Sequence, residues 1–188
     1  MRKGERTKQM ILQKATSIFN QQGYSGSSLS SIMKETGLEK GGIYRHFESK
    51  EELALQAFDY STSLLGERFK EAVSQAATTL DKLNAFIEVL KGLVRGDPIP
   101  GGCPIMNVAL EADDAYPLLA EQAKMSMFQL LSLMERIIIF GIESKEINPN
   151  TNIKQLAILW ISSLEGALAL SRLYDDPSYF DDVATIYI

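Results

Sequence analysis

Apolar residues recur at helical spacing along most of the chain. The first such stretch predicts a helix over residues 5–22, with one apolar face made of Ile11, Ala15, Ile18 and Phe19. Later stretches of the same period predict helices over about 40–47, 79–95, 103–113, 117–145 and 150–174. No convincing alternating strand pattern interrupts them. The pattern therefore predicts an all-α fold.

Near the N-terminus, polar residues and glycine predict where individual helices begin and end. Ser28 is placed to cap a short second helix, and Gly37 is placed to end it. Ser49 and Glu52 have the spacing of a capping box, which predicts the start of a longer fourth helix. Three short helices therefore fall within the first fifty residues, ahead of a set of longer ones.

One segment, RGDPIPGGCP, is rich in proline and glycine. We interpret it as a break inside the larger domain. The sequence then predicts two domains, a small one over residues 1–48 and a larger helical one over residues 49–188. A chain of 188 residues has room for this arrangement.

Charge is distributed unequally between these parts. Residues 1–50 contain nine Lys or Arg and four Glu, a net charge of +5, whereas the whole chain carries −5. The other 138 residues therefore carry −10. A basic N-terminal part in an acidic chain favours a polyanionic partner for the first domain.

Several classes of protein are disfavoured. The single cysteine, Cys103, cannot form an internal disulfide and fits a reducing cytoplasm. Neither C-x-x-C nor H-x-x-x-H occurs, which argues against a metal site of the usual kind, and nothing indicates another cofactor. We see no secretory signal, and the apolar stretch LAILWISSLEGALAL is too short to span a membrane. We expect a cytoplasmic protein that is not bound to membranes.

The short helices match a helix-turn-helix unit with its turn at Gly37 and Leu38. An apolar inner face would hold its helices together, made of Leu29, Ile32, Met33, Leu38, Ile43 and Phe47. The side chains that project outward are suited to DNA: Lys40, Tyr44, Arg45 and His46. Ser28 and Lys50 flank them as expected phosphate contacts. A nucleotide-binding loop is the alternative for Gly41 and Gly42, but the P-loop pattern is absent.

The stretch GYSGSSLSSIMKETGLEKGGIYRHFESKEEL resembles the DNA-binding domain of the TetR/AcrR family of bacterial repressors. The resemblance covers about thirty residues near the N-terminus. It implies DNA contacts from Ser28, Lys40, Gly41, Tyr44, His46 and Lys50. Arg45 stands where the family often has another aromatic residue, and Met33 stands where it usually has a small one.

The family resemblance also implies a ligand-binding domain and a homodimer in the rest of the chain. Helices 117–145 and 150–174 carry more apolar residues than one buried face needs, and small residues in the second allow close approach of helices. We therefore expect a two-fold dimer through these helices. Candidate residues for a pocket holding a small, largely apolar effector are Met106, Leu110, Met125, Phe128, Trp160 and Tyr174.

Cys103 stands at the start of a predicted helix, where the helix dipole favours a thiolate. Cys103 is therefore either a redox-responsive thiol or a buried packing residue. We expect a ligand-released repressor rather than an enzyme. The alternatives are an all-α ligand carrier, a thiol-based sensor acting through Cys103, and a thiol-dependent enzyme.

Overall fold

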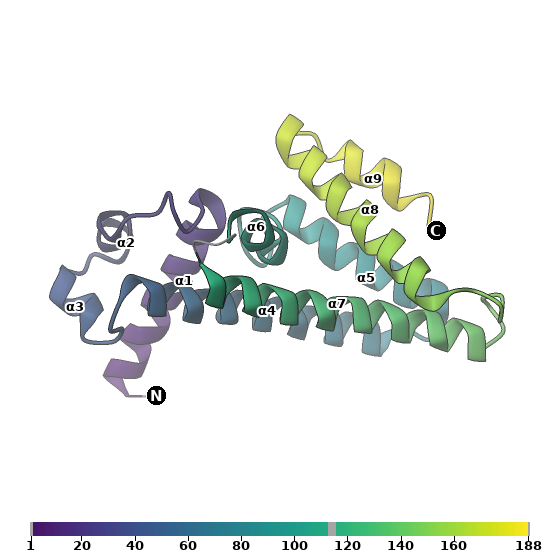
Figure 1. The fold of residues 1–188 in the computed structure, drawn as a ribbon, viewed down its shortest axis with the longest axis horizontal. Coiled ribbons are helices and arrows are strands. Elements are labelled where there is room, and N and C mark those ends of the chain that lie inside the picture. The colour runs from purple at the N-terminus through teal and green to yellow at the C-terminus, as the bar shows by residue number, and fades with distance from the viewer. Residues whose placement is uncertain (1, 113–115, 188) are drawn as a thin grey trace. The chain divides into compact units, whose positions relative to one another are not determined.

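The computed structural model describes residues 2–112 and 116–187. Over these residues the chain is helical and has no strand, which confirms the all-α expectation. The helices (Figure 1) are α1 (Lys3–Gln22), α2 (Leu29–Thr36), α3 (Lys40–Tyr44), α4 (Lys50–Gln75), α5 (Thr79–Val94), α6 (Pro104–Glu111), α7 (Pro117–Glu143), α8 (Ile153–Tyr174) and α9 (Ser178–Ala184).

Two compact units make up the chain. Unit 1 consists of residues 1–64 and 99–123, and unit 2 consists of residues 65–98 and 124–188. This division differs from the expected boundary between residues 48 and 49, because α6 and the start of α7 pack with the N-terminal helices. The segment RGDPIPGGCP is a break between helices, as expected, but the chain after it returns to unit 1.

The core of unit 1 is formed by α1, α2, α3 and the start of α4, together with α6 and the first turns of α7. Its buried apolar side chains include Ile11, Phe19, Ile32, Ile43, Phe47, Leu53, Phe58, Val108 and Leu119. The predicted inner face of the helix-turn-helix unit is confirmed. Ile32, Ile43 and Phe47 are buried there, and the remaining three residues of that face are half-buried against them.

Unit 2 is built around α5, α8 and α9, with the later turns of α4 and α7. The rings of Phe69 and Phe86 stack with their centroids 4.5 Å apart in its core. Helix α9 was not predicted, although its signal is present. The Asp176 carboxylate accepts the Ser178 N–H at 2.9 Å, and Pro177 stands just before the first turn.

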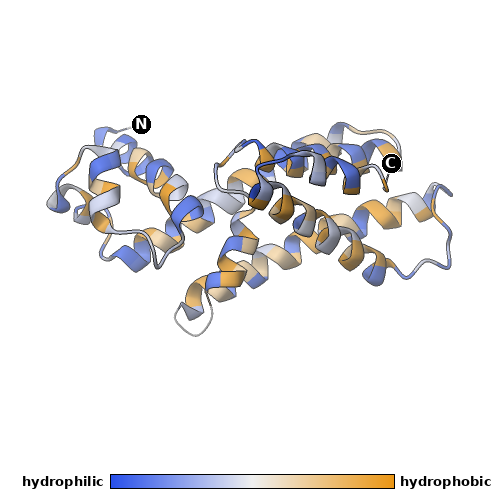
Figure 2. Cartoon of the chain, turned by 90° about the horizontal axis from the view of Figure 1, so that it is seen from above, coloured by the Kyte–Doolittle hydropathy of each residue, from blue (hydrophilic) through white to orange (hydrophobic). Residues whose placement is uncertain are grey.

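Helices α7 and α8 are long and apolar enough to cross a membrane, by length and composition alone. The apolar stretch LAILWISSLEGALAL, expected to be too short to span a membrane, is only part of α8, which extends over 22 residues. Both helices nevertheless bury apolar side chains, such as Met134 and Ile138 on α7 and Leu164 and Leu168 on α8. Figure 2 colours the hydrophobic residues of the chain orange. The core helices of a soluble protein have the same composition.

Candidate nucleic-acid interface

The second helix begins and ends as its sequence predicts. Ser28 has extended backbone angles, and its hydroxyl accepts the Ser31 N–H at 3.0 Å. Gly37 closes the helix with a φ of 69°, a left-handed conformation that glycine adopts without strain. The Ser28 hydroxyl is exposed beside the helix start. The same hydroxyl also lies 2.9 Å from the Ser31 hydroxyl, where either group can be the donor. When Ser31 donates, the Ser28 O–H is left to donate to a phosphate.

Helix α3 is shorter than expected and ends at Tyr44 rather than at residue 47. Arg45 is its C-cap residue, and the N–H groups of His46 and Phe47 both donate to the Ile43 carbonyl at 2.9 and 3.2 Å. The chain therefore tightens into a turn after Tyr44. This turn directs Phe47 into the core while Arg45 remains at the surface.

The outer side of α3 presents a cation, an aromatic ring and open backbone. Lys40, Tyr44 and Arg45 are all exposed, and the Lys40 ammonium lies 5.7 Å from the centroid of the Tyr44 ring. A Cβ atom added to Gly41 would meet no atom within 4 Å. At this position a large partner can therefore approach the backbone closely.

His46 is placed differently from the other predicted contacts. Its side chain is only half-buried, and a Cβ atom on Gly4 of α1 would lie 4.0 Å from its Cε1 atom. One turn further along α1, the Lys8 ammonium lies 5.3 Å above the Phe47 ring. The first turns of α1 therefore run beside the end of α3.

Lys50 supports the loop between α1 and α2. Its ammonium donates to the Tyr24 carbonyl at 2.7 Å, and its side chain is half-buried. An ammonium has three donors, so two remain for a phosphate. Because Lys50 also holds this loop, its removal would disturb local structure as well as any contact with DNA.

Glu111, at the end of α6, binds the other side of the same loop, and sequence reasoning missed it. Its carboxylate accepts the backbone N–H groups of Tyr24 at 2.8 Å and Ser25 at 2.6 Å. A Cβ atom on Gly23 would lie 2.8 Å from the same carboxylate, so Glu111 would have to shift to admit a side chain, and the φ of 76° at Gly23 favours glycine as well. Burial and, second, the Glu111 charge raise the pKa of Tyr24. The Tyr24 hydroxyl therefore stays protonated.

A second contact joins α6 to the end of α1. The Asn107 amide donates to the Asn20 carbonyl at 3.1 Å and to the Asn20 side chain at 2.9 Å. The Asn20 amide in turn donates to the carbonyls of Pro100 and Gly102, both at 2.9 Å. Asn107 and Glu111 are one helical turn apart, so a single face of α6 holds both the end of α1 and the loop that leads to α2.

We expect Glu111→Ala to lower the free energy of unfolding by about 1–2 kcal/mol, because two backbone N–H groups lose their acceptor. Urea denaturation measures this loss, and amide exchange should show faster opening at Tyr24 and Ser25. The matched control is Glu67→Ala, which removes an exposed carboxylate from α4. Equal stability of the two variants, with unchanged exchange at Tyr24, would show that the Glu111 contacts contribute nothing.

The residues predicted to line an effector pocket are dispersed. Met106 and Leu110 belong to unit 1, and the other four belong to unit 2. The exposed fraction is 81% for Leu110, 72% for Phe128, 60% for Tyr174 and 55% for Met125. Only Met106 and Trp160 are half-buried. In this chain, the four exposed side chains lie at the surface instead of in a cavity.

A hollow of about 250 Å³ does occur in unit 1, away from the predicted pocket residues. It is lined by Tyr24, Lys50, Glu51, Ala54, Tyr116 and Leu119. Cys103 is the N-cap residue of α6, as its sequence position predicts, but it is buried at 2% exposure. Burial of this kind suits packing, and an electrophile would reach the thiol only if the surrounding structure opened. No cluster of metal-ligating side chains occurs in residues 2–112 and 116–187.

Comparisons with known proteins agree with this geometry. Residues 11–57 match the family model for bacterial regulatory proteins of the tetR family, and residues 79–187 match the tetracyclin repressor-like C-terminal domain. The chain is 26% identical over 184 residues to the transcriptional repressor DhaR of Mycobacterium sp. strain GP1, covering 95% of this chain and 89% of that protein.

Solved structures are also similar. A TetR transcriptional regulator from Chloroflexus aurantiacus has a TM-score of 0.93 and 40% identity, covering 100% of this chain and 94% of that one. The TetR-family regulator CifR, solved as a cysteine mutant with 26 bp of operator DNA, has a TM-score of 0.82 at 20% identity and covers 95% and 94%. With a helix-turn-helix unit at its N-terminus and a matched C-terminal domain, the chain belongs to the TetR family of DNA-binding transcriptional regulators.

Proposed function

We propose that this regulator is a cytoplasmic, homodimeric repressor that binds a pseudo-palindromic operator and leaves it when a small, largely apolar effector binds. The observation that carries the proposal is the outer side of α3, where exposed Lys40, Tyr44 and Arg45 surround the open backbone at Gly41. Cations, an aromatic ring and close backbone approach are the features that bind phosphates and base edges.

The proposed contact residues divide into two roles. The predicted phosphate contacts are Ser28, Lys40, Gly41, His46 and Lys50, which supply hydroxyl, ammonium, backbone and imidazole groups. Tyr44 is the last residue and Arg45 the C-cap residue of α3, the helix that we propose lies in the major groove. The Arg45 guanidinium can donate two parallel hydrogen bonds to a guanine edge, and Tyr44 can pack on a thymine methyl. Base selection therefore rests mainly on Arg45.

The dimer proposal is supported by an exposed apolar face on α8. Leu159, Leu170 and Leu173 are exposed on one side of this helix, at spacings of about three turns and one turn. Between them lie Ser162 and Gly166, and a Cβ atom on Gly166 would meet no atom within 4 Å. A face of leucines around small residues is suited to close packing against a second helix.

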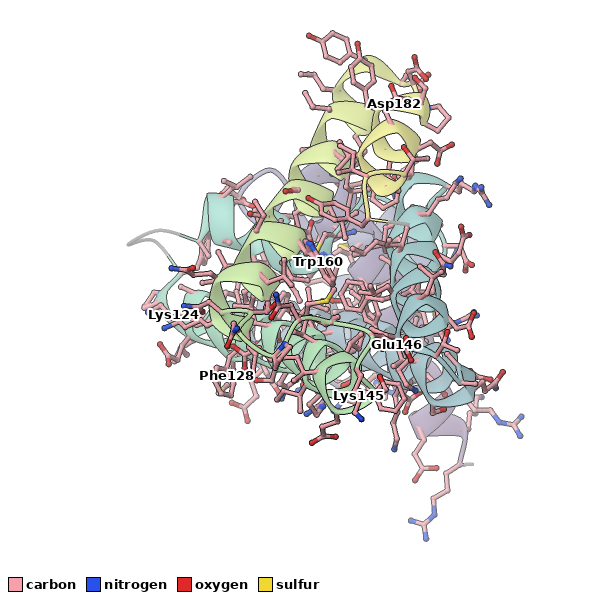
Figure 3. All side chains as sticks on the ribbon, turned by 90° about the vertical axis from the view of Figure 1, so that its right-hand side faces the viewer. Lys124, Phe128, Lys145, Glu146, Trp160 and Asp182 are labelled. Carbon is pink, nitrogen blue, oxygen red and sulfur yellow. The ribbon has the colours of Figure 1, made fainter. Side chains whose placement is uncertain are left out.

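Helix α7 carries a similar face. Met125, Phe128 and Ile139 are exposed along one side of it, and Figure 3 shows Phe128 at the outside of unit 2, whereas Trp160 lies inward among the helices. We therefore reassign Met125 and Phe128 from the effector pocket to the dimer face. Two copies of α7 and α8 would then form a four-helix interface.

We propose that effector binding changes the distance between the two helix-turn-helix units of the dimer. Met106 in unit 1 and Trp160 in unit 2 each remain a candidate effector contact within its own unit, because each is half-buried. Helix α4 carries Lys50 at its start and continues through 26 residues into unit 2. A ligand that favours a different placement of α4 would therefore favour a different spacing of the recognition helices.

A binding selection on random duplex DNA tests the function. We expect the recovered sequences to share a two-fold symmetric motif with half-sites about 34–36 Å apart, one turn of the duplex. Affinity should fall as salt rises. An absence of duplex binding, or binding that does not depend on salt, would contradict the proposal and favour a ligand carrier.

Arg45→Ala is expected to relax base selection at one position of each half-site, because a bidentate contact contributes about 1–3 kcal/mol of discrimination. The measurement is a competition between the selected operator and duplexes changed at single base pairs. Arg95→Ala, which removes an exposed arginine from the end of α5, is the control. If Arg45→Ala weakens all duplexes equally, Arg45 binds phosphate rather than a base.

A further inference from the structure

The first turns of α1 carry a group of exposed cations. Arg2, Lys3 and Arg6, here named the basic arm, are all exposed at the start of a helix whose first buried residue is Ile11. Figure 2 colours the turns beside the N label largely in the hydrophilic blue. From Lys3 to Ile11 the helix rises about 12 Å, so the arm extends beyond the core that holds α1.

The arm lies next to the proposed reading helix. Gly4, between Lys3 and Arg6, is close enough to the end of α3 that a Cβ atom on it would lie 4.0 Å from the His46 ring. The Lys8 ammonium lies 5.3 Å from the Phe47 ring, which fixes the next turn against the same end of α3. The basic arm therefore belongs to the same end of unit 1 as Tyr44, Arg45 and His46.

The charges of the arm are not neutralised by the protein. The ion pairs in the described part of the chain are Lys14–Glu35, Arg68–Asp97 and Lys91–Asp181, and none involves the arm. The one nearby carboxylate in sequence, Glu5, accepts the backbone N–H of Arg2 at 2.7 Å and so caps the helix. Three cations consequently remain available to an anion.

The position of these cations is also unfavourable for the helix itself. The start of a helix carries a partial positive charge, so Lys and Arg destabilise it there. Lys3 and Arg6 are three residues apart, where like charges repel. Their placement therefore lowers helix stability, and a bound polyanion would reverse both effects.

We propose that the basic arm binds phosphates of the operator beside the part of the groove that α3 enters. The proposal rests on the proposed function, since it needs the duplex to meet the end of α3. It adds an interaction surface that extends the contacted DNA beyond the helix-turn-helix residues. Because ammonium and guanidinium groups meet the backbone, the contact adds affinity for any sequence.

The test compares the full chain with the variant Arg2→Gln, Lys3→Gln, Arg6→Gln on the selected operator over a range of salt concentrations. Each lost phosphate contact should lower the slope of log affinity against log salt by about 0.9. The proposed dimer carries two arms and loses six cations, so the slope should fall by up to about 5.4. At physiological salt we expect affinity to fall about tenfold or more. The melting temperature should stay equal or rise, since unfavourable charges leave the start of α1.

The control variant is Lys70→Gln, Lys145→Gln, Lys154→Gln, which removes the same charge from exposed positions of unit 2. It should keep the salt slope of the original chain. If the arm variant also keeps that slope and affinity, the arm proposal is wrong although the regulator still binds its operator. If the unmodified chain binds no duplex, the proposed function itself fails, so the two failures are distinguishable.

Discussion

Replacing Gly166 by arginine is expected to convert the proposed dimer to a monomer and to abolish tight operator binding. Gly166 lies at the centre of the exposed face of α8, and no atom lies within 4 Å of where its Cβ would stand. The substitution is therefore accommodated in the single chain. It also removes a glycine from a helix, which stabilises helices by about 0.5–1 kcal/mol.

The effect arises only when two copies meet. A guanidinium group would prevent the close approach that Ser162 and Gly166 allow, and it would repel its counterpart across the two-fold axis. A monomer reads one half-site, so loss of the second linked site should lower operator affinity about 100-fold or more. Light scattering measures the mass, and a duplex titration measures the affinity.

Gly66→Arg is the matched control. Gly66 is also an exposed helix glycine with no atom within 4 Å of its Cβ position, and it lies in α4. It should leave mass and affinity unchanged. A Gly166→Arg protein that remains dimeric and binds the operator normally would place the dimer interface elsewhere.

Local chemistry made the helix-turn-helix unit predictable. The cap of α2 depends on Ser28 and Ser31, three residues apart, and its end depends on the left-handed conformation of Gly37. Interactions of this range leave a pattern in a short window of sequence. The α2 part of the inner face was predictable for the same reason, because Leu29, Ile32 and Met33 repeat at helical spacing. Phe47, in contrast, lies beyond the end of α3 and reaches the core through the turn after Tyr44.

Long-range contacts left no such pattern. Glu111 and Tyr24 are 87 residues apart, and nothing near either one predicts that a carboxylate of α6 accepts backbone N–H groups in the loop before α2. In the sequence, Gly23 predicts only the end of a helix. The structure adds that a side chain at position 23 would overlap the Glu111 carboxylate. The packing of α6 with unit 1, and so the boundaries of the two units, depends on these contacts.

The exposure of the predicted pocket residues could not be read from the sequence for a different reason. Apolar residues on a helix cover a core, a ligand or a second protein chain, and periodicity does not distinguish the three. Phe128 and Leu110 have the composition of a pocket residue, yet they are 72% and 81% exposed. Only the fold shows which apolar positions are left after the core is filled.

Gly41→Glu is expected to remove nearly all specific DNA binding while leaving the fold intact. Gly41 is exposed near the start of α3, and its Cβ position is open, so the side chain fits the free protein. A glutamate in the first turn also favours the helix. On the duplex, the same side chain would place bulk and negative charge where phosphates are proposed to approach, and affinity should fall about 100-fold or more.

A duplex titration and a thermal melt on the same sample measure the two halves of this prediction. Gly66→Glu makes the identical chemical change at an equally open helix position of α4, outside the proposed interface. We expect it to bind DNA as the original chain does. The expected result for Gly41→Glu is a lower DNA affinity with an equal or higher melting temperature. A distorted α3 would instead lower both the affinity and the melting temperature. If both glutamate variants bind equally well, the backbone at Gly41 does not face the duplex.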